Sequence, residues 1–181
     1  MTAGTEVRID ALAWGGSGVG RLASGKVVMV AGSAPGDLLR VRITEERSSH
    51  SFAAIEEIVE PGERVDPACA VAGRCGGCGW QHVPVEAQRR WKRDLIAAEI
   101  ARRGIGPADA IAPVVAGAPL GFRTRARLHR RGATTGFAAH ASHEIVSFEG
   151  CPVMSAPLRD LAARLVAALV DAPPGAADLE I

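Results

Sequence analysis

The 181-residue sequence contains no long hydrophobic run and only four cysteines. No stretch approaches the roughly 18 consecutive apolar residues of a membrane-spanning helix, so we expect no membrane association. The first residues, MTAGTEVRID, contain no apolar segment behind basic residues, as a secretory signal would. These absences predict a cytoplasmic protein, in which stable disulfides are uncommon. The 48% of hydrophobic residues is enough for a substantial core, so we expect a globular chain rather than a disordered one.

Acidic residues are missing from one segment, although the formal net charge of the whole chain is only +1. There is no acid between Asp109 and Glu144. A local excess of positive charge attracts anionic partners whatever the net charge is. A nucleic-acid partner is therefore compatible with this sequence. The arginines that crowd into nine positions of the segment are Arg123, Arg125, Arg127, Arg130 and Arg131.

Residues 1–61 contain several short stretches that are typical of β-strands. Residues 7–11 and 39–44 alternate between apolar and polar side chains, and residues 26–31 form a short apolar run. Residues 51–60 fit either a helix or a strand. Because glycine-rich turns separate these stretches, the pattern predicts a small β-barrel.

Residues 62–181 show a mixture of helical and strand patterns. Residues 83–104 predict a basic amphipathic helix, and residues 158–169 carry the apolar stripe of a second helix. Residues 122–129, FRTRARLH, alternate strictly and predict a strand with a cationic face. The whole pattern predicts an α+β chain, mainly β, with one domain over residues 1–61 and another over residues 62–181.

The four cysteines are unevenly spaced, with three close together and one far downstream. Cys69, Cys75 and Cys78 have the spacing C-x5-C-x2-C, and the fourth is Cys151. Clustered thiolates with one distant partner favour a [4Fe-4S] cluster, whose irons take four cysteine ligands. Zinc is an alternative, with His82 joining three cysteines as the fourth ligand. A redox pair in the CGGC segment and a set of buried apolar thiols are further alternatives, and spacing alone leaves all of them open.

Several segments resemble the bacterial RNA (uracil-5-)-methyltransferases, which methylate C5 of uridine using S-adenosylmethionine. The segment CGGCGWQHV, with a cysteine six residues before it, resembles the signature of that family. Residues 18–43 are similar to its N-terminal TRAM domain, a small OB-like barrel that binds RNA. The segment FRTRARL resembles the strand that opens its central domain, and residues 136–153 resemble the segment with the fourth cluster ligand. These matches follow the order of the family and cover nearly the whole chain.

The resemblance implies a ligand set and an RNA-binding surface. It implies that the four cysteines hold a [4Fe-4S] cluster in an α+β central domain that follows the TRAM barrel: Cys69, Cys75, Cys78 and Cys151. It implies RNA as the partner, and we expect contacts from basic residues on the predicted strands: Lys26, Arg40, Arg42, Arg123, Arg125, Arg127 and His129. Phe122 and Thr124 stand where the family usually has tyrosine and asparagine, so this chain lacks a phenolic hydroxyl and an amide there.

The family also has a Rossmann-like methyltransferase domain, which we expect to be absent from this chain. A glycine-rich loop for S-adenosylmethionine is not evident, because the only glycine after Cys151 is Gly175. We therefore expect an N-terminal fragment without catalytic residues, in which S-adenosylmethionine binds only to the full-length family member. On this hypothesis the helix at residues 83–104 packs on the missing domain, and the chain is a monomer.

The predicted function is the RNA-binding, cluster-bearing part of an RNA uracil-C5 methyltransferase, with ribosomal RNA favoured over transfer RNA as the substrate. The alternative is a free-standing RNA-binding or redox-sensing module that transfers no methyl group.

Overall fold

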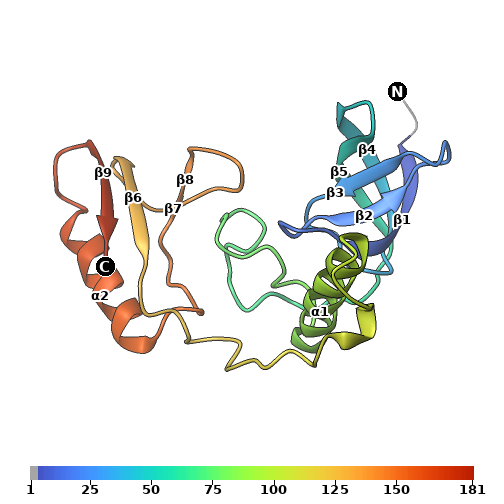
Figure 1. Ribbon diagram of the computed structural model, residues 1–181. Coiled ribbons are helices and arrows are strands. Elements are labelled where there is room, and N and C mark those ends of the chain that lie inside the picture. Colours follow the sequence, from blue (N-terminus) through green and yellow to red (C-terminus); the bar gives the residue numbers. More distant parts are fainter. Residues whose placement is uncertain (1–3) are drawn as a thin grey trace. The chain divides into compact units, whose positions relative to one another are not determined.

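The structure is a computed structural model that describes residues 4–181. It divides the chain into two compact units (Figure 1). The first consists of Met1–Asp66 and Gly79–Val115, and the second of Pro67–Cys78 and Ala116–Ile181. This division differs from the predicted boundary at residue 61. The difference arises because the cysteine loop packs with the second unit, while the helix that follows it stays with the first.

The first unit is built around a closed five-stranded barrel in the strand order β1-β2-β3-β5-β4. All neighbouring strands are antiparallel except β3 and β5, which are parallel. Residues 51–60, whose local pattern fits either a helix or a strand but which the resemblance assigns to a barrel strand, lie in a strand that pairs with both neighbours in the barrel. The strands are β1 (Thr5–Leu12), β2 (Gly18–Arg21), β3 (Val27–Val30), β4 (Leu38–Glu46) and β5 (His50–Glu60).

Alternate side chains of these strands fill the barrel, as a period of two requires. Each of them is almost completely removed from solvent. The backbones also approach closely, because a Cβ on Gly20 would lie only 2.3 Å from the carbonyl oxygen of Arg8. The GVG segment of β2 therefore serves strand packing in the barrel. The buried core consists of Val7, Ile9, Val28, Val30, Leu39, Val41 and Ala53.

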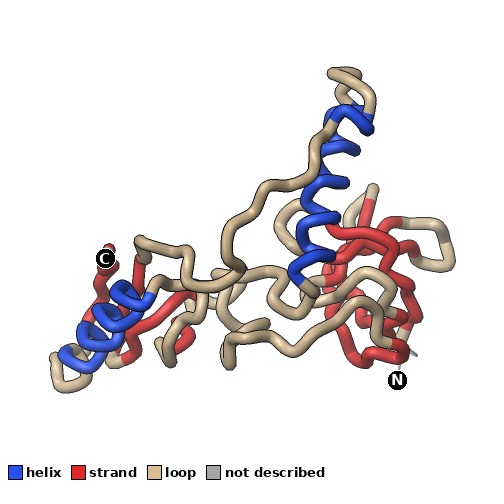
Figure 2. The backbone as a smooth tube through the Cα atoms, turned by 90° about the horizontal axis from the view of Figure 1, so that it is seen from below, coloured by secondary structure: helices blue, strands red, loops and turns tan. Residues whose placement is uncertain are grey.

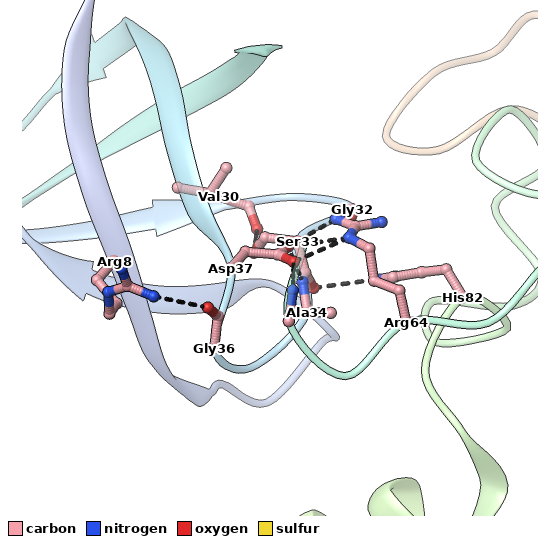
Figure 3. A network of polar contacts seen from close by, with 10 residues as sticks. Arg8, Val30, Gly32, Ser33, Ala34, Gly36, Asp37, Arg64 and His82 are labelled. Atoms are coloured by element: carbon pink, nitrogen blue, oxygen red, sulfur yellow. Dashed lines mark hydrogen bonds and ion pairs between the residues drawn. The ribbon is translucent and has the colours of Figure 1, made fainter. Parts of the chain in front are cut away.

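A buried carboxylate ties the turn between β3 and β4 to the segment after β5 (Figure 3). Asp37 is completely buried and accepts hydrogen bonds from the backbone N–H of Ala34 at 2.7 Å and of Gly62 at 2.8 Å. The guanidinium of Arg64 lies 2.7 Å from the same carboxylate and also donates to the carbonyl of Gly32. Burial alone raises the pKa of Asp37, but the hydrogen bonds from Arg64, Ala34 and Gly62 outweigh it and lower this pKa.

Helix α1 (Val85–Arg102) lies beside the barrel in both views of the chain (Figures 1 and 2). The predicted helix at residues 83–104 differs from it by two residues at each end. Ala87 is buried in a small apolar cluster with Ala34 and Val83, against which Trp80 and Trp91 pack. A short 3-10 helix, η1 (Ala108–Ala110), follows α1.

The second unit is a four-stranded antiparallel sheet in the order β8-β7-β6-β9, with one helix packed on it. The core joins Leu128 and Met154 to Leu158 and Ala162 of the helix. The guanidinium of Arg130 is buried and donates hydrogen bonds to carbonyl groups just beyond the C-terminal end of that helix. The elements are β6 (Arg127–Gly132), β7 (Thr134–Ala138), β8 (Ile145–Ser147), α2 (Ala156–Ala168) and β9 (Gly175–Glu180).

The strand expected at residues 122–129 begins five residues later, at Arg127. The segment before it runs beside the turn that leads into α2. The backbone N–H of Arg123 donates to the carbonyl of Val153 at 2.8 Å, and its carbonyl accepts from Ser155 at 2.8 Å. Arg123 and Met154 form an isolated bridge outside the sheet. Strict alternation in the sequence therefore extends beyond the hydrogen-bonded strand.

Candidate functional site

The cysteine loop is anchored on the strand β7 side of the second unit. The backbone N–H of Gly76 donates to the carbonyl of Ala138 at 3.0 Å, and Cys75 pairs with Ala139 in an isolated bridge. The loop is also closed on itself, because the N–H of Cys75 donates to the carbonyl of Val71 at 3.0 Å. Three cysteines are thereby held in the compact unit that contains Cys151.

The other three thiols lie close enough to Cys75 to affect its ionisation. All four are half-buried and free of disulfide bonds. Burial raises the pKa of the Cys75 thiol, and negative charge on Cys78, Cys69 and Cys151 raises it further, against a hydrogen bond from the N–H of Gly77 at 3.4 Å. Nevertheless, within residues 4–181 no three His, Cys, Asp or Glu side chains converge in the manner of metal ligands. The structure thus brings the cysteines near one another without forming a closed ligand shell.

His82 makes a hydrogen bond within the barrel unit (Figure 3). Its Nε2 is 3.0 Å from the carbonyl oxygen of Ser33, in the turn after β3. This contact holds the imidazole in the barrel unit, whereas the cysteines belong to the second unit. The structure therefore gives His82 a local hydrogen-bonding role.

The three basic candidates on the barrel all lie in ion pairs with acidic residues. Lys26 approaches Glu46 to 2.8 Å, and its hydrogen bond lowers the pKa of that carboxyl group. Because these pairs are exposed, salt and competing anions can exchange the partners readily. The remaining pairs join Arg40 to Glu6 and Glu57, and Arg42 to Glu56.

The basic candidates in β6 and just before it also face acids, which come from a distant part of the chain. Strand β9 pairs with β6 and places Glu180 at 3.7 Å from Arg125 and 3.6 Å from Arg127. His129 lies 2.8 Å from Asp178 of the same strand. The local absence of acids in the sequence therefore does not produce an uncompensated cationic face. Arg123 is half-buried and has no ion pair within the described part of the chain.

The exposure of two residues, Trp14 and Arg130, was not predicted from the sequence. The indole of Trp14 is 66% exposed in the turn between β1 and β2. Arg130 was counted among the clustered arginines, but it is 4% exposed and holds the end of α2. For Trp14 the available signal was an aromatic residue directly before Gly15-Gly16.

Comparisons with known proteins agree with the family resemblance. Residues 5–55 match the TRAM domain family. A protein from Thermosynechococcus vestitus, described as an uncharacterized RNA methyltransferase, is 40% identical over 91% of this chain. The 23S rRNA (uracil(1939)-C(5))-methyltransferase RlmD of Shewanella sediminis is 33% identical over 78% of this chain. The chain belongs to the RNA (uracil-5-)-methyltransferase family.

This chain spans 38% of the length of the first of these relatives and 34% of the second. A solved structure, the tRNA (uracil-54, C5)-methyltransferase of Pyrococcus abyssi in complex with S-adenosyl-L-homocysteine, shares the fold with a TM-score of 0.57 and 24% sequence identity. The match covers 88% of this chain and 35% of that one.

One part of the predicted fold has to be corrected, namely the prediction that a methyltransferase domain is absent from this chain. That prediction is wrong: nearly the whole chain follows the fold of a uracil methyltransferase. The physical reason is that the expectation relied on one glycine-rich loop. The barrel and the four-stranded sheet are themselves parts of that enzyme fold, and they need no such loop.

None of the helices in residues 4–181 has the length and apolar character that crossing a membrane requires.

Proposed function

We propose that these 181 residues bind the RNA substrate of an S-adenosylmethionine-dependent RNA uracil-C5 methyltransferase, and that they carry a [4Fe-4S] cluster. The observation that carries the proposal is the closed barrel of β1 to β5, which coincides with the TRAM match at residues 5–55. Small barrels of this kind bind single-stranded nucleic acids by combining cationic side chains with exposed aromatic rings. S-adenosylmethionine supplies the methyl group when it is bound.

Ribosomal RNA is the proposed substrate class. Relatives with 33% to 36% identity are named as 23S rRNA methyltransferases, whereas the matched transfer RNA enzyme is 24% identical. We assign phosphate contacts to exposed basic side chains whose ion pairs salt can exchange, together with Arg123. The proposed contacts are Lys26, Arg40, Arg42, Arg123, Arg125, Arg127 and His129.

The proposed cluster ligands are Cys69, Cys75, Cys78 and Cys151. The donor set fits such a cluster chemically, because burial and neighbouring thiols make ionisation of Cys75 unfavourable unless a cation compensates the charge. The N–H of Gly77 already donates to the Cys75 sulfur, as amides do around cluster sulfurs. A bound cluster would supply iron–thiolate bonds that tie the cysteine loop to the segment before α2.

The same assignment limits what these residues can catalyse. Methylation at C5 of uracil needs a nucleophile that adds to C6, and a thiolate is the usual choice. The sequence has four cysteines, and all four are committed to the cluster in this proposal. We therefore propose that the 181 residues hold the RNA but do not transfer a methyl group by themselves.

The experiment is a binding titration of the anaerobically purified 181-residue chain with single-stranded ribosomal RNA and with a matched duplex. Preferential binding of the single strand, with affinity that falls steeply as salt rises, is the expected result. Absence of RNA binding at low salt would refute the proposal. In parallel, labelled S-adenosylmethionine is added to the complex, and no label is expected in 5-methyluridine. Labelled product would refute the assignment of all four cysteines as ligands.

A further inference from the structure

An exposed tryptophan stands at the end of the β1–β2 hairpin. Trp14 is 66% exposed, in a protein in which aromatic residues make up only 4% of the sequence. The residues after it are Gly15, Gly16 and Ser17, and the large apolar residue before it, Leu12, is buried, so Trp14 does not continue an exposed apolar surface along the chain. The ring is therefore not part of the protein core, and it does not belong to a broad hydrophobic surface of the kind that binds other proteins.

The turn holds the backbone around Trp14 in a defined conformation. The N–H of Ala13 donates to the carbonyl of Ser17 at 2.7 Å, and the N–H of Gly16 donates to Ala13 at 3.1 Å. Gly15 and Gly16 both have positive φ, at 90° and 95°, which other residues rarely adopt. A ring presented on a hydrogen-bonded turn loses little conformational entropy when a flat ligand stacks on it.

A second indole lies next to the same turn, and a lysine lies over that indole. A Cβ on Gly16 would lie 3.0 Å from Nε1 of Trp80, so the turn rests directly on that indole. The Nζ of Lys92 lies 6.0 Å from the centre of the Trp80 ring. Lys92 is exposed and forms no ion pair within residues 4–181. Trp80 thus connects the turn that carries Trp14 to an exposed ammonium group within the barrel unit.

We propose that Trp14 is a stacking platform for an unpaired base of the RNA, and that Lys92 contacts a neighbouring phosphate. This inference rests on the proposed RNA-binding function and adds a specific contact to it. An aromatic face with a nearby cation suits a nucleotide, because the base is flat and the phosphate is anionic. A base in a duplex is stacked on its neighbours already, so the site selects single-stranded RNA.

The test compares the full 181-residue chain with Trp14→Ala, Trp14→Phe and Lys92→Ala in titrations with single-stranded RNA of about ten nucleotides. Trp14→Ala should weaken binding about tenfold, the loss expected for one stacked base, with an unchanged salt dependence. Trp14→Phe should retain most of the affinity. Lys92→Ala should reduce the slope of log K against log salt by about 0.7, the value for one phosphate contact on a single strand.

Ile105→Ala is the matched control, because Ile105 is an apolar residue of the same unit that is 70% exposed. Its RNA affinity should equal that of the wild type. RNA should also quench tryptophan fluorescence in the wild type, and Trp14→Phe should lose this quenching. Equal RNA binding by the wild type and Trp14→Ala would overturn the stacking site but not the proposed function. A change in the oligomeric state of Trp14→Ala with unchanged RNA affinity would have the same meaning. Failure of the wild type to bind RNA would instead overturn the proposed function.

Discussion

The imidazole of His129 and the carboxylate of Asp178 meet at 2.8 Å across strands β6 and β9, although 49 residues separate them in the chain. Arg131 lies 3.4 Å from the same carboxylate. Glu180, also in β9, likewise lies 3.7 Å from Arg125 and 3.6 Å from Arg127. The basic face of β6 therefore carries its own counter-charges, which a phosphate of the proposed RNA partner would have to replace.

Removing these counter-charges should strengthen RNA binding. The double variant Asp178→Asn with Glu180→Gln frees the β6 cations, and we expect about two- to fivefold tighter binding at low salt, the range of exposed ion pairs. The measurement is an RNA titration at several salt concentrations. The control is Asp160→Asn with Asp171→Asn, which changes the net charge equally at exposed acids outside these ion pairs. An equal gain in both variants would mean that only net charge matters.

Removing the cations should have the opposite effect. Arg123→Ala with Arg125→Ala is expected to lower both the RNA affinity and its dependence on salt, because two phosphate contacts are lost. The charge-matched control is Arg159→Ala with Arg164→Ala, at exposed positions of α2. Binding by the Arg123 and Arg125 variant that equals the control would exclude this segment from the RNA surface.

The buried pair of Asp37 and Arg64 should control the stability of the barrel. Asp37→Asn leaves the Arg64 guanidinium without its charge partner and should cost about 3 kcal/mol in the free energy of unfolding. The exposed pair of Arg8 and Glu60 provides the control, and Glu60→Gln should cost less than about 1 kcal/mol. Urea unfolding measures both. Similar losses in the two variants would contradict the role given to the buried pair.

The same pair predicts a dependence of stability on pH. The pKa of Asp37 is lowered in the folded protein from its usual value of 3.8, so the ionised carboxylate stabilises the fold. This contribution is fully present above that usual value and is lost as the pH falls through the lower, folded-state pKa. The difference in unfolding free energy between the wild type and Asp37→Asn should therefore shrink in strong acid. A difference that stays constant there would contradict the assignment.

Local patterns in the sequence predicted several individual elements. Alternation located the strand around Val7 and Ile9, because one face of a barrel strand must be buried. The helix at residues 83–104 followed from its amphipathic period. The spacing of the cysteines singled out the four thiols that the structure places near one another.

Local sequence patterns could not predict which strands pair when they lie far apart in the chain. The sequence around Arg125 contains no acids, so nothing local indicated that β9 would bring Glu180 to that face. Residues 122–126 alternate like a strand, but the backbone of Arg123 bonds to Val153 and Ser155 instead. The exposure of Trp14 also depends on how the barrel closes, and the alternation of apolar and polar residues along a strand does not predict this.

The central claim is that RNA binding and an iron–sulfur cluster occur together in these residues. Its most direct test is the iron and acid-labile sulfide content of the chain purified without oxygen. The account predicts near-equal amounts of iron and sulfide, and Cys151→Ser should lose most of both because one of four ligands is removed. The matched control, Ser155→Ala, removes a hydroxyl group from the same turn and should retain both elements. Zinc without sulfide in the wild type, or an intact cluster in Cys151→Ser, would contradict the account.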